Sequence, residues 1–358
     1  MLIYAKNDKA RDWTYSQLTV TCGLTLSSYE PAESFLGIGI TQHLHDESST
    51  TRKGISVTCP GAIATWKDTY NRPDATQPTI VSDDFDEIIN EPWEAHALTS
   101  TELQIQKQLQ AVIGCLRFYA AWNRHDILVQ IHCSRIATRF VSPTQRILDE
   151  AFHIMDYVRG TPNEGLYFPH ESEDGATGKL SFCSDASLHT DRIHGRFQYG
   201  FFILFNGTPI LAVSKLHRCA ADGTNWAEWI ALSEGIKPLM ILRRILQETG
   251  HPVAPPRRAK LPGYIPDPND YAIACELDSE GAWRAGTSEV RQKATLFHAA
   301  KAHHVWWRQN IGSIVLRVVK THDNPADILT KNLRFEDIQR HWKSFPWTPP
   351  PSDGQPAQ

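Results

Sequence analysis

Four acidic side chains in the second half of the chain have the type and spacing to hold divalent metal ions. Each follows a predicted strand or opens a predicted helix, so neighbouring elements could bring them to one edge of a sheet. Clustered carboxylates repel each other and raise each other's pKa values, and magnesium or manganese suits such hard oxygen ligands. Two such ions about 4 Å apart can clamp the attacking water and the leaving oxygen of a phosphodiester. The four residues are Asp185, Glu228, Asp278 and Asp327.

The first of these acids closes a predicted buried strand. Leu180 to Cys183 favour a strand, and the Ser184–Ser187 stretch that follows has a turn composition. We therefore expect the strand to end at Asp185, where a metal or a substrate can reach the carboxylate. A solvated turn or a helix cap explains the same pattern without a metal, and the order of the later elements favours the metal site.

The elements that follow position the other three acids. Strand alternation, an Asn206-Gly207 hairpin signal and helical periodicity predict three strands, then helix, strand, helix, strand and helix. Glu228 lies in the first turn of the long helix, Asp278 follows the fourth strand, and Asp327 opens the last helix. This order predicts an α/β fold with a mixed sheet flanked by helices. The predicted strands cover 179–185, 198–205, 209–215, 271–277 and 313–320, and the helices cover 225–248, 290–309 and the residues from about 325.

The first half of the chain predicts an α+β region. Thr99 and Glu102 form a capping-box pattern that opens a helix, and a shorter helix follows Asp126. Ser142-Pro143 predicts an N-cap with proline at the first helical position, in a helix that ends at Gly160. Strands are predicted at 2–5 and 34–40, a strand pair within 54–67, an irregular connection over 70–92, and a polar linker at 169–178.

Composition excludes several classes of protein. Of the 358 residues, 41% are hydrophobic and 21% are charged, which is typical of a globular chain with two or three domains. The net charge of −4 argues against a protein that simply coats nucleic acid. The 7 cysteines are odd in number and form no CxxC pair, which predicts reduced thiols in a cytoplasmic or nuclear protein. Neither a signal-peptide pattern nor an apolar run of about 18 residues is found, so we expect no membrane partner.

The motifs around the four acids resemble a known family. Glu228 lies in Ala-Glu-Trp-Ile-Ala-Leu, Asp278 opens Asp-Ser-Glu-Gly-Ala-Trp, and Asp327 lies in Ala-Asp-Ile-Leu-Thr-Lys. Together with Asp185, in this order, they resemble the ribonuclease H domain of copia-type retrotransposon Pol polyproteins. The resemblance reaches about Trp347 and extends upstream into the C-terminal part of the reverse transcriptase. The upstream segments that carry it are 35–40, 114–119, 124–127, 134–135 and 157–166.

The resemblance implies an activity and a division of the chain. In that family the four acids bind two magnesium ions, and the domain cuts the RNA strand of an RNA–DNA hybrid, leaving a 3′-hydroxyl and a 5′-phosphate. The Val319–His322 segment resembles one in cellular ribonucleases H whose mobile histidine aids proton transfer or product release. His322 is thus a further catalytic candidate, or a plain loop histidine that titrates near neutral pH. The implied regions are a remnant of the reverse transcriptase palm at 1–97, a helical thumb or connection at 98–168, a linker at 169–178, a ribonuclease H-like domain at 179–347 and a disordered tail at 348–358.

The chain departs from the family pattern at several positions. The polymerase Tyr-x-Asp-Asp motif would lie just before Leu2, so the resemblance implies a truncated fragment without polymerase activity. Trp226 stands where the family has the first glutamate of Glu-Ala-Glu. Pro238 lies inside the predicted long helix and should kink it. Phe297 stands where the family has the lysine of a Lys-His motif, with His298 after it.

A cluster of cations predicts a nucleic-acid-binding face. Tryptophans at 283, 306 and 307 are interleaved with the cations, and Glu289 is the only acid between residues 284 and 308. Such a face would contact phosphates, and its binding would weaken with salt. A solvated helix with core tryptophans explains the same pattern. The cations are Arg284, Arg291, Lys293, Lys301 and Arg308.

Three functions remain open from the sequence. The first is a metal-dependent endonuclease (Mg²⁺, with Mn²⁺ as the alternative) that cuts the RNA strand of RNA–DNA hybrids. The second is a catalytically inactive nucleic-acid-binding relic of a retrotransposon polyprotein. The third is another nuclease of the same superfamily, such as an integrase or a resolvase. The expected partners are an RNA–DNA hybrid and other parts of a retrotransposon polyprotein.

Overall fold

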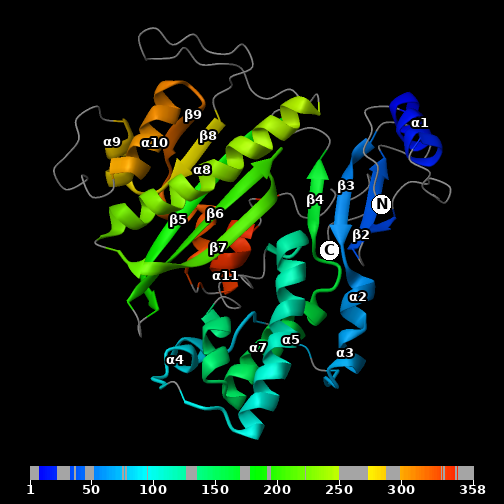
Figure 1. Ribbon diagram of the computed structural model, residues 1–358, viewed down its shortest axis with the longest axis vertical. Coiled ribbons are helices and arrows are strands. Elements are labelled where there is room, and N and C mark those ends of the chain that lie inside the picture. The colour runs from blue at the N-terminus through cyan, green and yellow to red at the C-terminus, as the bar shows by residue number, and fades with distance from the viewer. Residues whose placement is uncertain are drawn as a thin grey trace.

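Two β-sheets and the helices around them make up the structure, a computed structural model (Figure 1). The predicted strand at 2–5, the linker residues 170–177, residues 126–134 and the tail 348–358 lie outside the described residues. The structure describes residues 8–21, 33–35, 38–44, 52–74, 76, 79–94, 96–125, 135–169, 178–191, 195–221, 223–249, 273–287, 299–331, 333, 335–342 and 345.

The larger sheet is mixed and has five strands in the order β7-β6-β5-β8-β9. The strands β5, β6 and β7 form an antiparallel meander, and β8 and β9 run parallel to β5. Asn206 and Gly207 have φ values of 50° and 83°, as the predicted type I′ hairpin requires. The predicted α/β fold is therefore confirmed. The strands are β5 (Leu180–Asp191), β6 (Arg196–Phe205), β7 (Thr208–Ala220), β8 (Ile273–Leu277) and β9 (Ile314–Val318).

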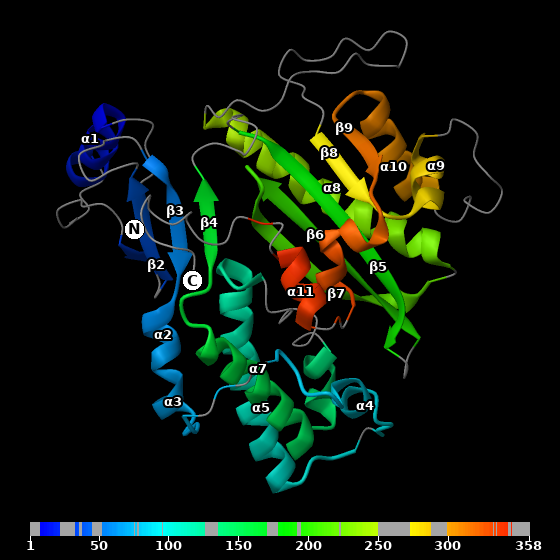
Figure 2. The ribbon, with the colours of Figure 1, turned by 180° about the vertical axis from the view of Figure 1, so that it is seen from behind.

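The smaller sheet belongs to the predicted α+β region and is antiparallel, in the order β1-β2-β3-β4. It lies beside the larger sheet (Figures 1 and 2), and the Thr208 hydroxyl of β7 donates a hydrogen bond to the Tyr167 carbonyl of β4 at 2.6 Å. The expected strand pair within 54–67 is wrong, because Pro60 begins a helix after one strand. The strands are β1 (Ser34–Phe35), β2 (Ile38–Leu44), β3 (Arg52–Thr58) and β4 (Leu166–Pro169).

The helices begin and end largely at local sequence signals. Thr99 and Glu102 form the predicted capping box of α5. The N-cap of α7 is Thr144, two residues after the predicted Ser142, because the Thr144 hydroxyl accepts the Ile147 N–H. No helix in the described ranges is long and apolar enough to cross a membrane. The helices are α1 (Asp8–Ser16), η1 (Gln17–Thr21), α2 (Pro60–Ala64), α3 (Trp66–Thr69), α4 (Phe85–Ile89), α5 (Ser100–Trp122), η3 (Thr138–Val141), α7 (Gln145–Gly160), α8 (Thr224–Glu248), α9 (Glu280–Thr287), α10 (Ala299–Asn310), η5 (Thr321–Asp323), η6 (Pro325–Leu329) and α11 (Phe335–Trp342).

The five-stranded sheet is covered on both faces. Alternate residues of a strand point to opposite faces, so Phe182 packs with α8 in one hydrophobic cluster and Cys183 belongs to another. The second cluster joins that face of the sheet to α5, α7 and α11. Figures 1 and 2 show α8 in front of the sheet in one view and α11 in front of it in the other. The helices of the first half therefore share a core with the larger sheet.

His125 gives the core a pH dependence. Its side chain is buried, its Nδ1 lies 2.5 Å from the Ala120 carbonyl near the end of α5, and burial lowers its pKa to about 4. The unfolded chain binds a proton near pH 6.5, so it takes up more protons than the folded chain as the pH falls. We expect the free energy of unfolding to fall by about 2 kcal/mol between pH 8 and pH 5 from this residue alone.

Urea unfolding of the wild type and of His125→Asn at both pH values measures this contribution. Asparagine can still donate to the Ala120 carbonyl but does not titrate. The variant should therefore lose clearly less stability than the wild type on acidification. An equal loss in both proteins would contradict the assignment.

Candidate metal centre

Asp185 lies inside strand β5 and not at its end as predicted. The strand continues to Asp191, because the residues after Asp185 keep their pairing with β6. The parallel pairing with β8 stops at Cys183, opposite Glu276, so Asp185 stands two residues beyond it. Asp278 follows β8 as predicted, also two residues beyond that pair. The two carboxylates therefore leave adjacent parallel strands at the same edge.

Glu228 reaches the same edge from α8. The helix begins at Thr224, which places Glu228 in its second turn and corrects the predicted first turn. One carboxylate oxygen, Oε1, accepts the Ala186 backbone N–H at 3.3 Å, next to Asp185. The other, Oε2, is buried without a hydrogen-bond partner. A buried carboxylate oxygen in that state is costly unless a cation or a donor reaches it.

Three of the four predicted acids form one group. Asp185, Glu228 and Asp278 each offer a carboxylate oxygen, and these atoms lie within 4.8 Å of one another. Asp185 and Glu228 are buried, and Asp278 is partly exposed, so the group opens to solvent on one side.

Asp327 is the fourth acid and lies beside this group without being part of it. It is buried in η6, a 3₁₀-helix that replaces the predicted start of the last α-helix. Its Oδ1 accepts the Lys331 ammonium at 2.9 Å, and the same ammonium lies 3.4 Å from Oδ1 of Asp185. Lys331 thus connects Asp327 to the other acids.

Residues of the same stretch hold Asp185 in place. The Thr330 hydroxyl donates to Oδ2 of Asp185, and Thr330 is fully buried. Asn324 caps η6 with its side-chain oxygen and donates its side-chain N–H to the Ser184 carbonyl at 3.0 Å. Sequence reasoning assigned no role to these residues, although Thr330 and Lys331 end the Ala-Asp-Ile-Leu-Thr-Lys motif.

The electrostatics of the centre follow from burial and crowding. Burial raises the pKa of Asp185 against the opposing effect of Lys331. Burial, then the charges of Asp185 and Asp278, raises the pKa of Glu228 well above its ordinary range. Burial and the charge of Asp185 raise the pKa of Asp327 to about 7. Burial lowers the pKa of Lys331, but the negative charges of Asp185 and Asp327 have the larger effect and raise that pKa to about 12. Among the described residues, the Lys331 ammonium is the one cation paired with these carboxylates, so their remaining negative charge favours the binding of further cations.

Comparison with known proteins identifies relatives of the chain. The Pol polyprotein of the transposon TNT 1-94 from Nicotiana tabacum is 28% identical over 228 residues, which are 62% of this chain. That of the transposon RE1 from Arabidopsis thaliana is 26% identical over 237 residues, or 66% of the chain. The Ty1-DR1 Gag-Pol polyprotein from Saccharomyces cerevisiae is 22% identical over 252 residues, or 68%. Roughly two thirds of the chain is homologous to copia/Ty1-type retrotransposon Pol polyproteins. The matched regions are 15%, 14% and 13% of these relatives' own lengths, and no protein-family model matches the chain.

Solved structures with a similar arrangement include ribonucleases H. LC11-RNase H1 from compost is 18% identical, with a TM-score of 0.31 over 46% of this chain and 99% of that chain. The foamy viral protease–reverse transcriptase in complex with RNA/DNA hybrid is 10% identical, with a TM-score of 0.34 over 67% of this chain and 27% of that chain.

Outside the acidic group, the other predicted site residues lie on η5, α9 and α10 where the structure describes them. His322 is exposed in η5, and its Nε2 lies 3.3 Å from the Asp323 carboxylate. Arg284 forms an ion pair with Glu280 at 2.6 Å, and Lys301 forms one with Glu234 at 2.8 Å. The Arg308 guanidinium stacks 5.0 Å from the centre of the Trp307 ring. Arg291 and Lys293, like Phe297 and His298, lie outside the described residues.

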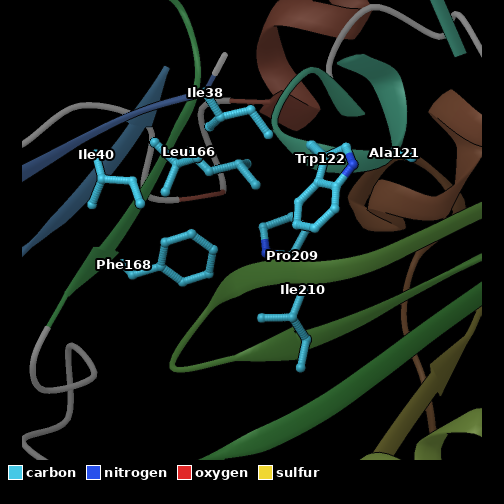
Figure 3. A pocket seen from close by; sticks show the side chains of 9 residues that line it. Ile38, Ile40, Ala121, Trp122, Leu166, Phe168, Pro209 and Ile210 are labelled. Carbon is cyan, nitrogen blue, oxygen red and sulfur yellow. The ribbon is translucent and has the colours of Figure 1, made fainter. Parts of the chain in front are cut away.

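An apolar cavity of about 560 Å³ lies between the two sheets, apart from the acids. Figure 3 shows side chains of β2, β4, α5 and β7 around it. No acid lines it, so it offers no ligand to a metal ion. Its lining is Ile38, Ile40, Val57, Ala121, Trp122, Leu166, Phe168, Pro209 and Ile210.

Gly200 allows η6 to approach the sheet where it supports Asp185. Gly200 pairs with Asp185 across β5 and β6, and a Cβ on it would lie 2.5 Å from the Leu329 Cβ. We expect Gly200→Ala to displace η6 and to lower the free energy of unfolding by about 1–3 kcal/mol. Gly61→Ala is the matched control, because a Cβ there meets nothing within 4 Å and alanine favours the helix α2. Urea unfolding that shows equal losses in both variants would refute the prediction.

Proposed function

We propose that the chain is a metal-dependent endonuclease that cuts the RNA strand of RNA–DNA hybrids. The observation that carries the proposal is the group of Asp185, Glu228 and Asp278, with ligand oxygens within 4.8 Å of one another. The homology to retrotransposon Pol polyproteins and the resemblance of the motifs to their ribonuclease H domain supply the substrate class. The two-ion centre is part of the proposal.

The residues of the group fit a divalent ion. All ligand atoms are carboxylate oxygens, which suit Mg²⁺ or Mn²⁺, and the unpartnered Oε2 of Glu228 is a buried oxygen that a hard cation would satisfy. Asp185, Glu228 and Asp278 would hold the first ion, with Asp327 on the Lys331 side. Bound there, divalent ions supply an activated water and a positive charge at the scissile phosphate.

The rest of the chain positions these ligands. The Ala186 N–H orients Glu228, and the Thr330 hydroxyl orients Asp185. Asn324 fastens η6, and with it Asp327, to the backbone of β5. Hydrogen bonds of this kind, from residues that do not touch the ion themselves, hold the metal ligands in the positions that catalysis needs. We propose that the exposed His322 aids proton transfer or product release. For this role its side chain must move away from the Asp323 carboxylate.

The nucleic-acid face remains part of this proposal. Arg284, Lys301 and Arg308 are the described members of the predicted cation set, and each is at least partly exposed on α9 or α10. Each would contact phosphates of the hybrid. Trp307 is also exposed and would pack against the same hybrid. Binding should therefore weaken as the salt concentration rises.

The regions implied by the resemblance are proposed with the same function. Residues 179–347 would form the nuclease, 169–178 a linker, 98–168 a thumb or connection, and 1–97 a palm remnant. Because one hydrophobic cluster joins α5 and α7 to the large sheet, removing the first half would expose that face. The full chain is therefore the protein to test.

The test is cleavage of an end-labelled RNA–DNA hybrid by the full chain in Mg²⁺. We expect the RNA strand alone to be cut, with 3′-hydroxyl products, and both EDTA and Asp185→Asn to stop the reaction. Cutting of duplex DNA at a similar rate would indicate another nuclease of the superfamily. A folded wild type that binds the hybrid without cutting it would overturn the proposal in favour of a nucleic-acid-binding protein.

A further inference from the structure

Lys331 joins the three-acid group to the fourth acid, because it pairs with both Asp185 and Asp327. Its ammonium is 2.9 Å from Oδ1 of Asp327 and 3.4 Å from Oδ1 of Asp185. Asp327 and Asp185 are both almost fully buried, at 5% and 1% exposed. Two buried carboxylates thus share one internal cation.

The backbone that carries Lys331 is fixed to the site. The Lys331 and Thr330 N–H groups donate to the Asp327 carbonyl at 2.9 and 3.1 Å. The Thr330 hydroxyl donates to Asp185, while the Lys331 side chain is itself only 30% exposed. The low exposure of the lysine side chain and the bond from the neighbouring Thr330 hydroxyl to Asp185 make the ammonium a built-in part of the centre.

We propose that Lys331 is a resident positive charge that makes the second divalent ion bind weakly, in competition with its ammonium. The inference deepens the proposed function and rests on metal binding at the centre. The first ion has Asp185, Glu228 and Asp278. Of these, Lys331 pairs with Asp185, at 3.4 Å, and it pairs more closely with Asp327, at 2.9 Å. A second ion that uses Asp327 must displace the ammonium or endure its repulsion.

The flexible lysine side chain suits such a role. Its four-carbon stem can swing the ammonium to solvent without moving the backbone, so the second site can open without unfolding η6. The centre would then hold one ion at low metal concentration and two at high concentration. Since the proposed cleavage needs both ions, Lys331 would set the metal concentration at which the enzyme works.

The test is a Mn²⁺ titration of the full chain, with free Mn²⁺ measured by electron paramagnetic resonance. We expect one tight and one weak ion in the wild type, and a second ion bound roughly tenfold or more tightly in Lys331→Met, because the competing charge is removed. Lys331→Arg keeps the charge and should stay within about threefold of the wild type. Lys107→Met makes the same change on the exposed face of α5 and should match the wild type.

Two outcomes would overturn the proposal. One is an unchanged second-ion affinity in Lys331→Met. The other is a second ion bound roughly tenfold or more tightly in Lys331→Arg than in the wild type, although the charge is kept, and this arm decides the question even if the methionine variant does not fold. Melting temperatures add a readout independent of activity: Mg²⁺ should raise the melting temperature of Lys331→Met more than that of the wild type, since only there do the two acids lack a cation.

Cleavage assays on the same preparations separate this proposal from the proposed function. Suppose that the wild type does not cut the hybrid but Lys331→Met still tightens the second Mn²⁺ ion. That result would refute the proposed nuclease activity and support the proposed role of Lys331. A wild type that cuts hybrid, with a titration that does not respond, refutes the resident charge alone.

Discussion

Asp278→Asn will reduce cleavage of the RNA strand at least about a thousandfold while leaving hybrid binding within about threefold of the wild type. Asp278 is the most accessible acid of the three-acid group, and it follows β8 directly. An amide carries no charge, so the variant loses a ligand for the divalent ion and keeps the shape of the side chain. Because phosphates repel a carboxylate, losing the charge does not weaken binding of the hybrid.

Single-turnover cleavage and an equilibrium binding assay in the same buffer measure the two effects separately. Asp149→Asn is the matched control, because Asp149 is exposed on α7 and contacts Gln145. That variant should cut at the wild-type rate. A cleavage rate of Asp278→Asn within tenfold of the wild-type rate would contradict the proposal that the acidic group binds the catalytic metal ions.

Asp156→Ala will lower the free energy of unfolding by about 3–5 kcal/mol. Asp156 is buried on α7 and is flanked by two arginines from different segments. Its Oδ2 accepts Nη2 of Arg72 at 2.5 Å, and its Oδ1 accepts Nη1 of Arg159 at 2.8 Å. Removing the carboxylate leaves both guanidinium groups without their shared counter-charge, and Arg159 is nearly buried.

Urea unfolding measures this loss, and Arg146→Ala provides the contrast. Arg146 also joins two acids, Asp84 and Glu91, but its side chain is 54% exposed, so water and salt screen the pairs and the loss should stay below about 1 kcal/mol. The loss of stability in Asp156→Asn should lie between those of Asp156→Ala and Arg146→Ala, because the amide oxygen still accepts a hydrogen bond. A loss below about 1 kcal/mol in Asp156→Ala would contradict the buried-pair argument.

Much of the fold could be predicted because the signals are local. The capping box at Thr99 and Glu102 and the Asn206-Gly207 turn each depend on neighbours within a few residues. The order of strands and helices after Lys179 follows from the same kind of pattern, except that α9, between β8 and α10, was not predicted. Where competing local signals stood side by side, as at Ser142 and Thr144, the sequence pattern favoured the wrong cap, because it is the Thr144 hydroxyl that accepts the Ile147 N–H.

The acidic residues were likewise identified by type and by their place beside strands and helices, but their arrangement was not. Asp185 lies inside its strand because β6 keeps pairing with it, which turn composition does not reveal. Asp327 lies outside the three-acid group, and Lys331 stands between it and Asp185. Residues 185, 228, 278 and 331 meet only when the parallel strands, α8 and η6 are packed together. The sequence by itself determined which acidic side chains are present, and the tertiary structure decided which of their oxygens lie together and which contact the lysine, because that choice depends on contacts between residues far apart in the chain.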